Sequence, residues 1–163
     1  MRKRLGLILL VVVGTIGCDR VTKEWATRTL RTSPPRSYAG DAIRLVYTEN
    51  PGAFLGLGST LPHGVRFWTF TVGCGVLLLG LVGWAALRRG VPLSTALSAA
   101  LIVGGGAGNL VDRIQQGRVV DFLNLGAFGL RTGIFNVADV AITTGVILLV
   151  LLPRPRRPPS PTP

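Results

Sequence analysis

Apolar residues gather in four long stretches along the chain, and polar or turn-forming segments separate them. A helix needs about 20 predominantly apolar residues to cross the hydrocarbon core of a membrane. Each stretch is close to that length, although the first reaches it only if its helix continues past Cys18 to Trp25. The pattern predicts an all-α membrane protein with four transmembrane helices, at residues 5–25, 67–87, 92–111 and 134–152.

The third stretch carries the glycines Gly104, Gly105, Gly106 and Gly108. Small residues let helix backbones approach closely in membranes, so this helix is expected to contact its neighbours tightly.

The segment between the first two stretches has a different pattern. Residues 43–48 have strand character and residues 50–52, Asn-Pro-Gly, favour a turn. We therefore expect a small β-rich region outside the membrane. At the other end of the chain, residues 153–163 are basic and rich in proline, and this pattern predicts a disordered cytoplasmic tail. Residues 1–152 are expected to form a single domain.

The composition is typical of a membrane protein, and the distribution of basic residues along the chain predicts its orientation. The chain is 48% hydrophobic, with a net charge of +11. Its basic residues flank the apolar stretches instead of forming an aromatic-interleaved patch, so we expect no nucleic acid partner. Eight of the 18 basic residues crowd into short segments on the side of the two termini. The positive-inside rule then places both termini in the cytoplasm and the acidic residues towards the outer face.

Two aspartates stand in apolar surroundings. Asp121 lies in Val-Val-Asp-Phe-Leu, and Asp139 begins the fourth stretch. Ionisable groups at membrane depth are costly and indicate a functional site, and two nearby carboxyls favour one shared proton and general acid–base chemistry. Asn136, Asp139 and Thr143 would share a helix face. An alternative remains open, since Asn136 or Asp139 would also cap a helix N-terminus.

Other polar residues near the stretches receive structural interpretations. Asp19 and Lys23 form an i,i+4 pair. Asn109 and Asp112 share a helix face, and we interpret Asp112 and Arg113 as a structural ion pair.

The cysteines and the single histidine, His63, suggest no metal site and no cofactor. Cys18 and Cys74 lie in separate apolar stretches and are interpreted as small buried residues. The segment before Cys18 is similar to a lipobox, but three further apolar stretches argue against a lipid-anchored exported protein.

Five motifs follow one another along the chain: residues 19–23 (DRVTK), 50–56 (NPGAFLG), 108–113 (GNLVDR), 119–122 (VVDF) and 135–139 (FNVAD). Taken together, they resemble those of the bacterial lipoprotein signal peptidases (signal peptidase II), in the same order. Arg20, where that family often has glutamine, is a local variation.

The resemblance implies an inner-membrane aspartyl endopeptidase that cuts diacylglyceryl-prolipoproteins just before the lipidated cysteine. It implies Asp121 and Asp139 as the catalytic pair near the outer face, and inhibition by globomycin-like peptides. Membrane lipids and prolipoproteins are the expected partners, and a monomer is expected. The supporting residues it implies are Asn50, Gly52, Asn109, Arg113 and Asn136, with Asp19, Lys23 and Asp112 in structural roles.

Two other classes of protein would also place charged residues in a membrane. A proton-coupled carrier usually shows repeated halves with broken helices, and the sequence has no internal repeat. A purely structural membrane subunit leaves the two aspartates unexplained.

Overall fold

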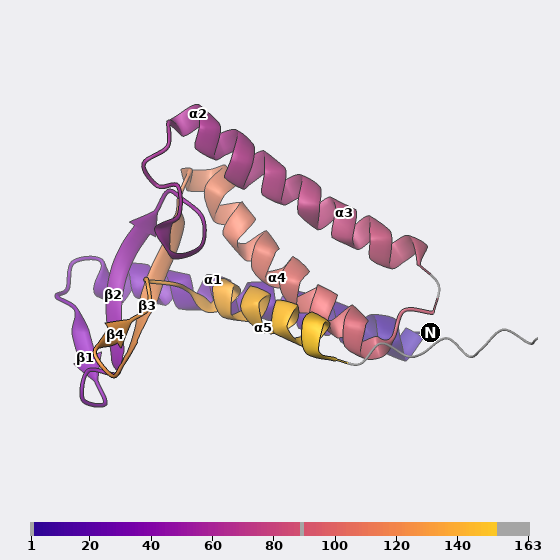
Figure 1. The fold of residues 1–163 in the computed structure, drawn as a ribbon, viewed down its shortest axis with the longest axis horizontal. Coiled ribbons are helices and arrows are strands. Elements are labelled where there is room, and N and C mark those ends of the chain that lie inside the picture. Colours follow the sequence, from indigo (N-terminus) through magenta and orange to yellow (C-terminus); the bar gives the residue numbers. More distant parts are fainter. Residues whose placement is uncertain (1, 89, 153–163) are drawn as a thin grey trace, which may run out of the picture.

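The computed structural model describes residues 2–88 and 90–152, and the predicted tail at 153–163 lies outside them. Helices fill one end of the molecule and a small sheet fills the other (Figure 1). In chain order the elements are α1 (Arg2–Leu30), β1 (Arg36–Tyr38), β2 (Ile43–Asn50), the 3-10 turn η1 (Phe54–Gly56), α2 (His63–Arg66), the π-helical η2 (Phe67–Val72), α3 (Gly73–Leu87), α4 (Leu93–Gln116), β3 (Val119–Ala127), β4 (Leu130–Arg131) and α5 (Val137–Leu151).

Three helices are long and apolar enough to cross a membrane: α1, α4 and the continuous helix His63–Leu87 formed by α2, η2 and α3. The fourth predicted span is shorter than expected, because α5 begins only at Val137 and has 15 residues. At 1.5 Å per residue α5 is roughly 22 Å long, less than the ~30 Å hydrocarbon core. The described residues therefore show three full-length spans and one short apolar helix.

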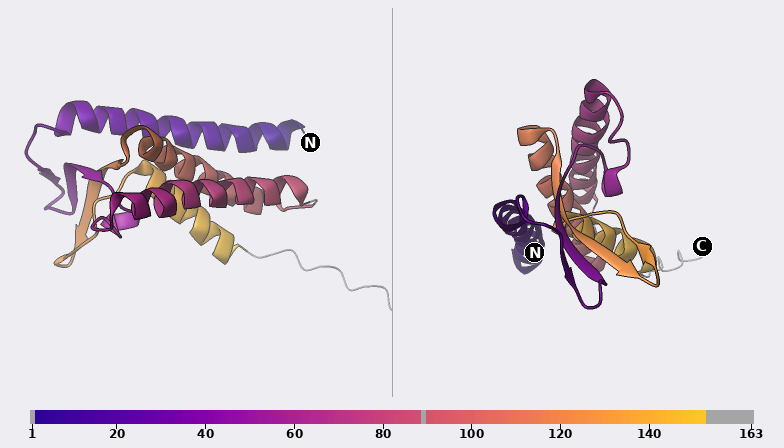
Figure 2. Two further views of the ribbon diagram at one scale, coloured as in Figure 1. Left: turned by 90° about the horizontal axis from the view of Figure 1, so that it is seen from above. Right: turned by 90° about the vertical axis from the view of Figure 1, so that its left-hand side faces the viewer.

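Helix α4 lies at the centre and contacts the other long helices through consecutive glycines. A Cβ atom at Gly104 would lie 2.8 Å from Thr15 of α1, at Gly105 2.4 Å from the Ala138 carbonyl of α5, and at Gly106 2.6 Å from Leu78 of α3. Successive helical residues point about 100° apart, so three glycines in a row serve three different neighbours. The expected close helix packing is confirmed, and Figure 2 shows α4 between the other helices.

The sheet is antiparallel with the order β1-β2-β3-β4. The predicted strand at 43–48 is present as β2 and extends to Asn50, which pairs with Val119 of β3. The C-terminal end of α1 holds the sheet, because Ala26 and Leu30 are buried against Phe122. Asp121 is thus a strand residue opposite Thr48, in the segment between the predicted third and fourth spans.

The expectation that both cysteines are buried was wrong. Cys18 is exposed and Cys74 is partly exposed, and both are free thiols. The buried residues of α1 form a stripe, Asp19, Lys23, Ala26 and Leu30, that faces the rest of the protein. Cys18 precedes Asp19 by one residue and points away from that stripe, because adjacent helical side chains diverge.

The glycine contacts of α4 make a first prediction. Gly105→Ala should destabilise the protein by about 1–3 kcal/mol, because the new methyl group overlaps the rigid backbone of α5. Gly14→Ala in α1 is the matched control, since a Cβ there meets nothing within 4 Å. Thermal unfolding in detergent, followed by tryptophan fluorescence, measures both. Equal midpoints for the two variants would contradict the packing described.

Candidate active site

The site is built around the first turn of α5. Asn136 is the N-cap, and its side-chain oxygen accepts a hydrogen bond from the Asp139 backbone N–H at 3.0 Å. In return, Asp139 Oδ2 accepts from the Asn136 backbone N–H at 3.2 Å. This reciprocal pair is a capping box, so the capping alternative is correct for both residues. It uses one atom of each side chain, and the Asn136 amide nitrogen and Asp139 Oδ1 have other partners.

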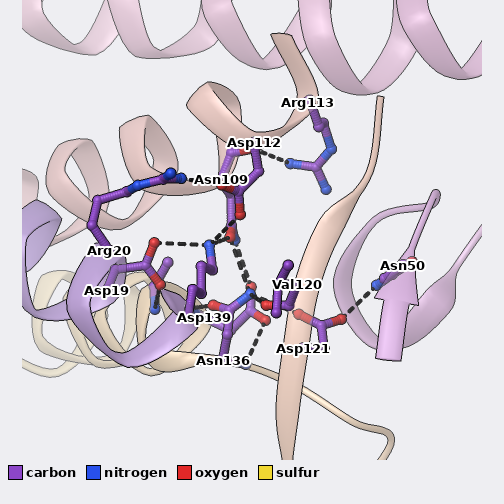
Figure 3. A network of polar contacts seen from close by, with 12 residues as sticks. Asp19, Arg20, Asn50, Asn109, Asp112, Arg113, Val120, Asp121, Asn136 and Asp139 are labelled. Atoms are coloured by element: carbon purple, nitrogen blue, oxygen red, sulfur yellow. Dashed lines mark hydrogen bonds and ion pairs between the residues drawn. The ribbon is translucent and has the colours of Figure 1, made fainter. Parts of the chain in front are cut away.

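Those other partners bring the two aspartates into one site (Figure 3). Asn136 Nδ2 lies 2.7 Å from Asp121 Oδ1, and the side chain of Asn136 is fully buried. Asn109 Nδ2 donates to Asp139 Oδ1 at 2.9 Å. Asn136 Nδ2 also lies 3.1 Å from Asn109 Oδ1, which closes a ring of Asn109, Asp139 and Asn136, and Asn136 joins Asp121 of β3 to this ring. Asp121 and Asp139 are 2% and 8% exposed.

The turn after β2 contacts the second carboxylate oxygen of Asp121. Asn50 Nδ2 donates to Asp121 Oδ2 at 2.9 Å and to the Ala53 carbonyl at 2.9 Å. Asn50 Oδ1 accepts from the Gly52 backbone N–H at 2.8 Å. Gly52 must be glycine here, because a Cβ atom would lie 2.5 Å from the Leu57 carbonyl. Arg113 ties this turn to α4 by donating to the Gly52 carbonyl at 2.9 Å.

A second cluster of buried charges lies behind the aspartates. The Lys23 ammonium is 2.8 Å from Asp19 Oδ2, 2.8 Å from Asp112 Oδ2 and 2.8 Å from Asn109 Oδ1. The ammonium therefore donates a hydrogen bond to Asn109 and forms ion pairs with the two carboxylates. Asp19 Oδ1 accepts from the Ala138 backbone N–H at 3.0 Å, so a residue of α1 also caps α5.

Asp112 does not pair with Arg113, and that expectation was wrong. Its partners are Lys23 and Arg20, both from α1. Arg113 follows Asp112 on the helix and therefore points about 100° away, towards the turn at Gly52. Sequence reasoning missed Arg20, which looked like a flanking variation. Together Arg20 and Lys23 balance the charges of Asp112 and Asp19, so the cluster is neutral.

Comparisons with known proteins agree with this geometry. Residues 11–153 match the family model described as signal peptidase (SPase) II. The chain belongs to the signal peptidase II family. Among its relatives, the lipoprotein signal peptidase of Syntrophomonas wolfei is 37% identical over 90% of this chain and 89% of its own length. That of Burkholderia ambifaria is 42% identical, over 90% of this chain and 84% of the relative.

Solved structures agree at the level of the fold. A bacterial membrane enzyme solved at 2.3 Å superimposes with a TM-score of 0.79 and 29% identity, covering 90% of this chain and 86% of the other. The resemblance that the five motifs indicated is confirmed, and the chain is a multi-pass membrane protease of the signal peptidase II family.

In this signal peptidase II, the Asp121 carboxyl has a shifted pKa. Burial raises the pKa of Asp121 to about 6, although the hydrogen bond from Asn50 opposes that rise. The charge of Asp139 raises the Asp121 pKa further, and Asn136 lowers it. Burial and the neighbouring charge of Asp139 therefore both favour the protonated form of Asp121. Within residues 2–88 and 90–152, no three His, Cys, Asp or Glu side chains cluster as metal ligands.

The buried lysine makes a second prediction. Lys23→Met should cost about 3–5 kcal/mol of stability, because two buried carboxylates lose their ammonium partner. That cost corresponds to a fall of roughly 10 °C or more in the unfolding midpoint of a chain this size. Arg28→Met is the control, since its i,i+4 pair with Glu24 is exposed and worth about 0.3–0.5 kcal/mol. Thermal unfolding in detergent measures the midpoints of both variants. An unchanged midpoint for Lys23→Met would mean that the cluster adds nothing to stability.

Proposed function

We propose that this signal peptidase II is an aspartyl endopeptidase that cuts diacylglyceryl-modified prolipoproteins just N-terminal to the lipidated cysteine. Asp121 and Asp139 are the catalytic pair in this proposal. The observation that supports it most directly is the network of amides between β3, α4 and α5, through which Asn136 and Asn109 hold the two buried carboxyls in one site.

The arrangement suits hydrolysis by a shared-proton carboxyl pair. The ionised carboxylate takes a proton from a water molecule, and the resulting hydroxide bonds to the scissile carbonyl carbon. The protonated carboxyl donates its proton towards the carbonyl oxygen as negative charge develops there. When the tetrahedral intermediate collapses, the C–N bond breaks and the amine leaves with a proton from the pair. The site-supporting side chains Asn50, Asn109 and Asn136 donate to carboxylate oxygens and hold the pair in place during these steps.

The position of the pair suits an amphipathic substrate. Asp139 lies in the first turn of the apolar helix α5, and Asp121 lies on the sheet next to it. A signal peptide helix and acyl chains would lie among the apolar helices, and the bond to be cut would lie where helices meet sheet. The turn around Asn50 and Gly52 is placed to exclude bulk water from the scissile bond. We expect globomycin-like peptides to compete at this site and the monomer to be active.

A proton-coupled carrier is the main rival function, and the geometry favours the peptidase. A carrier places its ionisable groups near the middle of the membrane, between broken helices. Here the two aspartates and their amides gather at one end of the helices, beside the sheet. Cleavage of a purified, lipidated prolipoprotein, blocked by globomycin, distinguishes the two classes.

The membrane orientation gives a third prediction. We propose an inner-membrane protein with four spans, both termini in the cytoplasm and the sheet on the outer face, because short basic segments flank the spans at the termini side. Reporter fusions near Tyr38 and Leu125 should report the outer side, and a fusion after Leu152 should report the cytoplasm. A cytoplasmic signal from the Tyr38 fusion would reverse this orientation.

The catalytic pair gives a fourth prediction. Asp121→Asn and Asp139→Asn should each lower cleavage by at least ~100-fold, because an amide is nearly isosteric but cannot exchange the proton. The double variant should be little worse than either single one, since the pair acts as a unit. The assay is gel-shift cleavage of a lipidated precursor at matched amounts of folded enzyme. Near-normal turnover by either variant would refute the aspartyl mechanism.

The Asp121 pKa gives a fifth prediction, for the pH dependence. With a pKa of about 6, Asp121 keeps its proton below that pH and loses it above. Ionisation of both carboxyls removes the acid of the pair, so kcat/KM should fall up to tenfold per pH unit as the pH rises through that pKa. The measurement is initial rates across roughly pH 5 to 8 on one precursor. A rate that rises steadily through this range would exclude a required proton on the pair.

A further inference from the structure

An apolar groove lies at the end of the helices opposite the sheet. It has a volume of about 730 Å³, with α1 and α3 as its sides and α4 as its floor. Its lining includes Leu5, Ile8 and Val12 of α1, Leu81 and Ala85 of α3, and Ala99 of α4. The arginine end of the groove is remote from the catalytic pair, because the 17 residues of α1 between Arg2 and Asp19 span roughly 26 Å. The other end of the groove, at Val12, lies roughly 10 Å along α1 from Asp19.

The groove forms because α3 diverges from α4 on the side of the Leu78–Gly106 contact that is nearer the termini. Leu78 of α3 packs onto Gly106, whereas nearer the termini the floor consists of small side chains, Ala96, Ala99 and Ala100. No residue of α3 is buried, and Leu81, Val82 and Ala85 of this helix line the groove. A volume of this size is within the range of about 300–1,000 Å³ that holds small ligands. In a bilayer, an acyl chain matches such an apolar lining.

The groove ends in positive charge. Arg2, Arg4 and Arg88 line it, and no acidic residue does. The Arg4 guanidinium donates to the Val91 carbonyl and joins α1 to the start of α4. Among residues 2–88 and 90–152, the Arg2 and Arg88 side chains have no such hydrogen bond or ion pair, so both are available to an anion. Two guanidiniums beside an apolar groove match a phosphate joined to acyl chains.

Positive charge also argues against two other occupants. A signal peptide begins with a basic segment, which three arginines would repel. Residues 153–163 of this chain carry three arginines and no acidic residue, so like charges oppose their binding as well.

We propose that the groove between α1 and α3 is a binding site for an anionic phospholipid. One acyl chain lies between the two helices over the alanine floor, and the phosphate binds the guanidiniums of Arg2 and Arg88. The bound lipid fills the space that separates α3 from α1 and so links α3 to the rest of the protein. This site is independent of the cleavage reaction and does not rest on the identity of the catalytic residues.

Native mass spectrometry of the full chain, released from detergent, tests the proposal. Phosphatidylglycerol and phosphatidylcholine with the same acyl chains are added separately. We expect the parent to bind phosphatidylglycerol at least ~10-fold more tightly, and Arg2→Gln/Arg88→Gln to lose that preference. The matched control is Arg28→Gln/Arg36→Gln, which removes the same charge at the other end of the helices and should keep the preference. Equal binding of the two lipids by the parent, or an unchanged preference in Arg2→Gln/Arg88→Gln, overturns the proposal.

A groove-filling variant separates a lipid site from a substrate site. Ala85→Trp should lose both phospholipids, while its KM for a lipidated precursor stays within about twofold of the parent and its unfolding midpoint without added lipid is unchanged. A several-fold rise in KM would assign the groove to the signal peptide and refute the lipid site. Retention of phosphatidylglycerol by folded Ala85→Trp would show that the lipid lies elsewhere, and would refute the site equally.

Discussion

The buried ammonium of Lys23 is the interaction on which the rest of this structure depends. It binds Asp19 from its own helix and Asp112 and Asn109 from α4, and so joins the two helices near the end that carries the sheet. Buried carboxylates are tolerable only when paired, so each acid of the cluster requires a cation in reach. Arg20 supplies the second one. Among residues 2–88 and 90–152, the acids without an ion pair are Asp121 and Asp139, the proposed catalytic pair.

The same cluster determines the hydrogen-bonding directions of the site. An asparagine amide can turn by 180°, and its donor end must be fixed if it is to face a carboxylate. Lys23 donates to Asn109 Oδ1, which leaves Asn109 Nδ2 for Asp139. Asp19 meanwhile caps α5 at Ala138 and holds the helix start against α1. Residues that take no part in the reaction thereby position those proposed to do so.

Helix capping and the proposed catalytic site use different atoms of the same two residues, Asn136 and Asp139, at the start of α5. The Asn136 backbone N–H, the Asn109 amide and the positive end of the helix dipole stabilise an ionised Asp139 carboxylate, which suits Asp139 as one member of the proposed pair. A capping box also keeps Asn136 in one rotamer, and its amide reaches Asp121. The capping box also explains why α5 is short, because the helix begins directly after its N-cap, Asn136.

Much of this protein was determined locally by its sequence. The apolar stretches, the glycines of α4, the strand at 43–48 and the two unexpected aspartates are properties of neighbouring residues, and the five motifs identified the family. Tertiary structure alone decided which side chains meet. Arg20 rather than Arg113 pairs with Asp112, Cys18 faces outwards, and Asp121 accepts a hydrogen bond from Asn50, 71 residues away. These outcomes depend on the direction in which each helix turns a side chain and on contacts between distant segments. Neither is encoded in the spacing of nearby residues, because the same local pattern fits several arrangements in space.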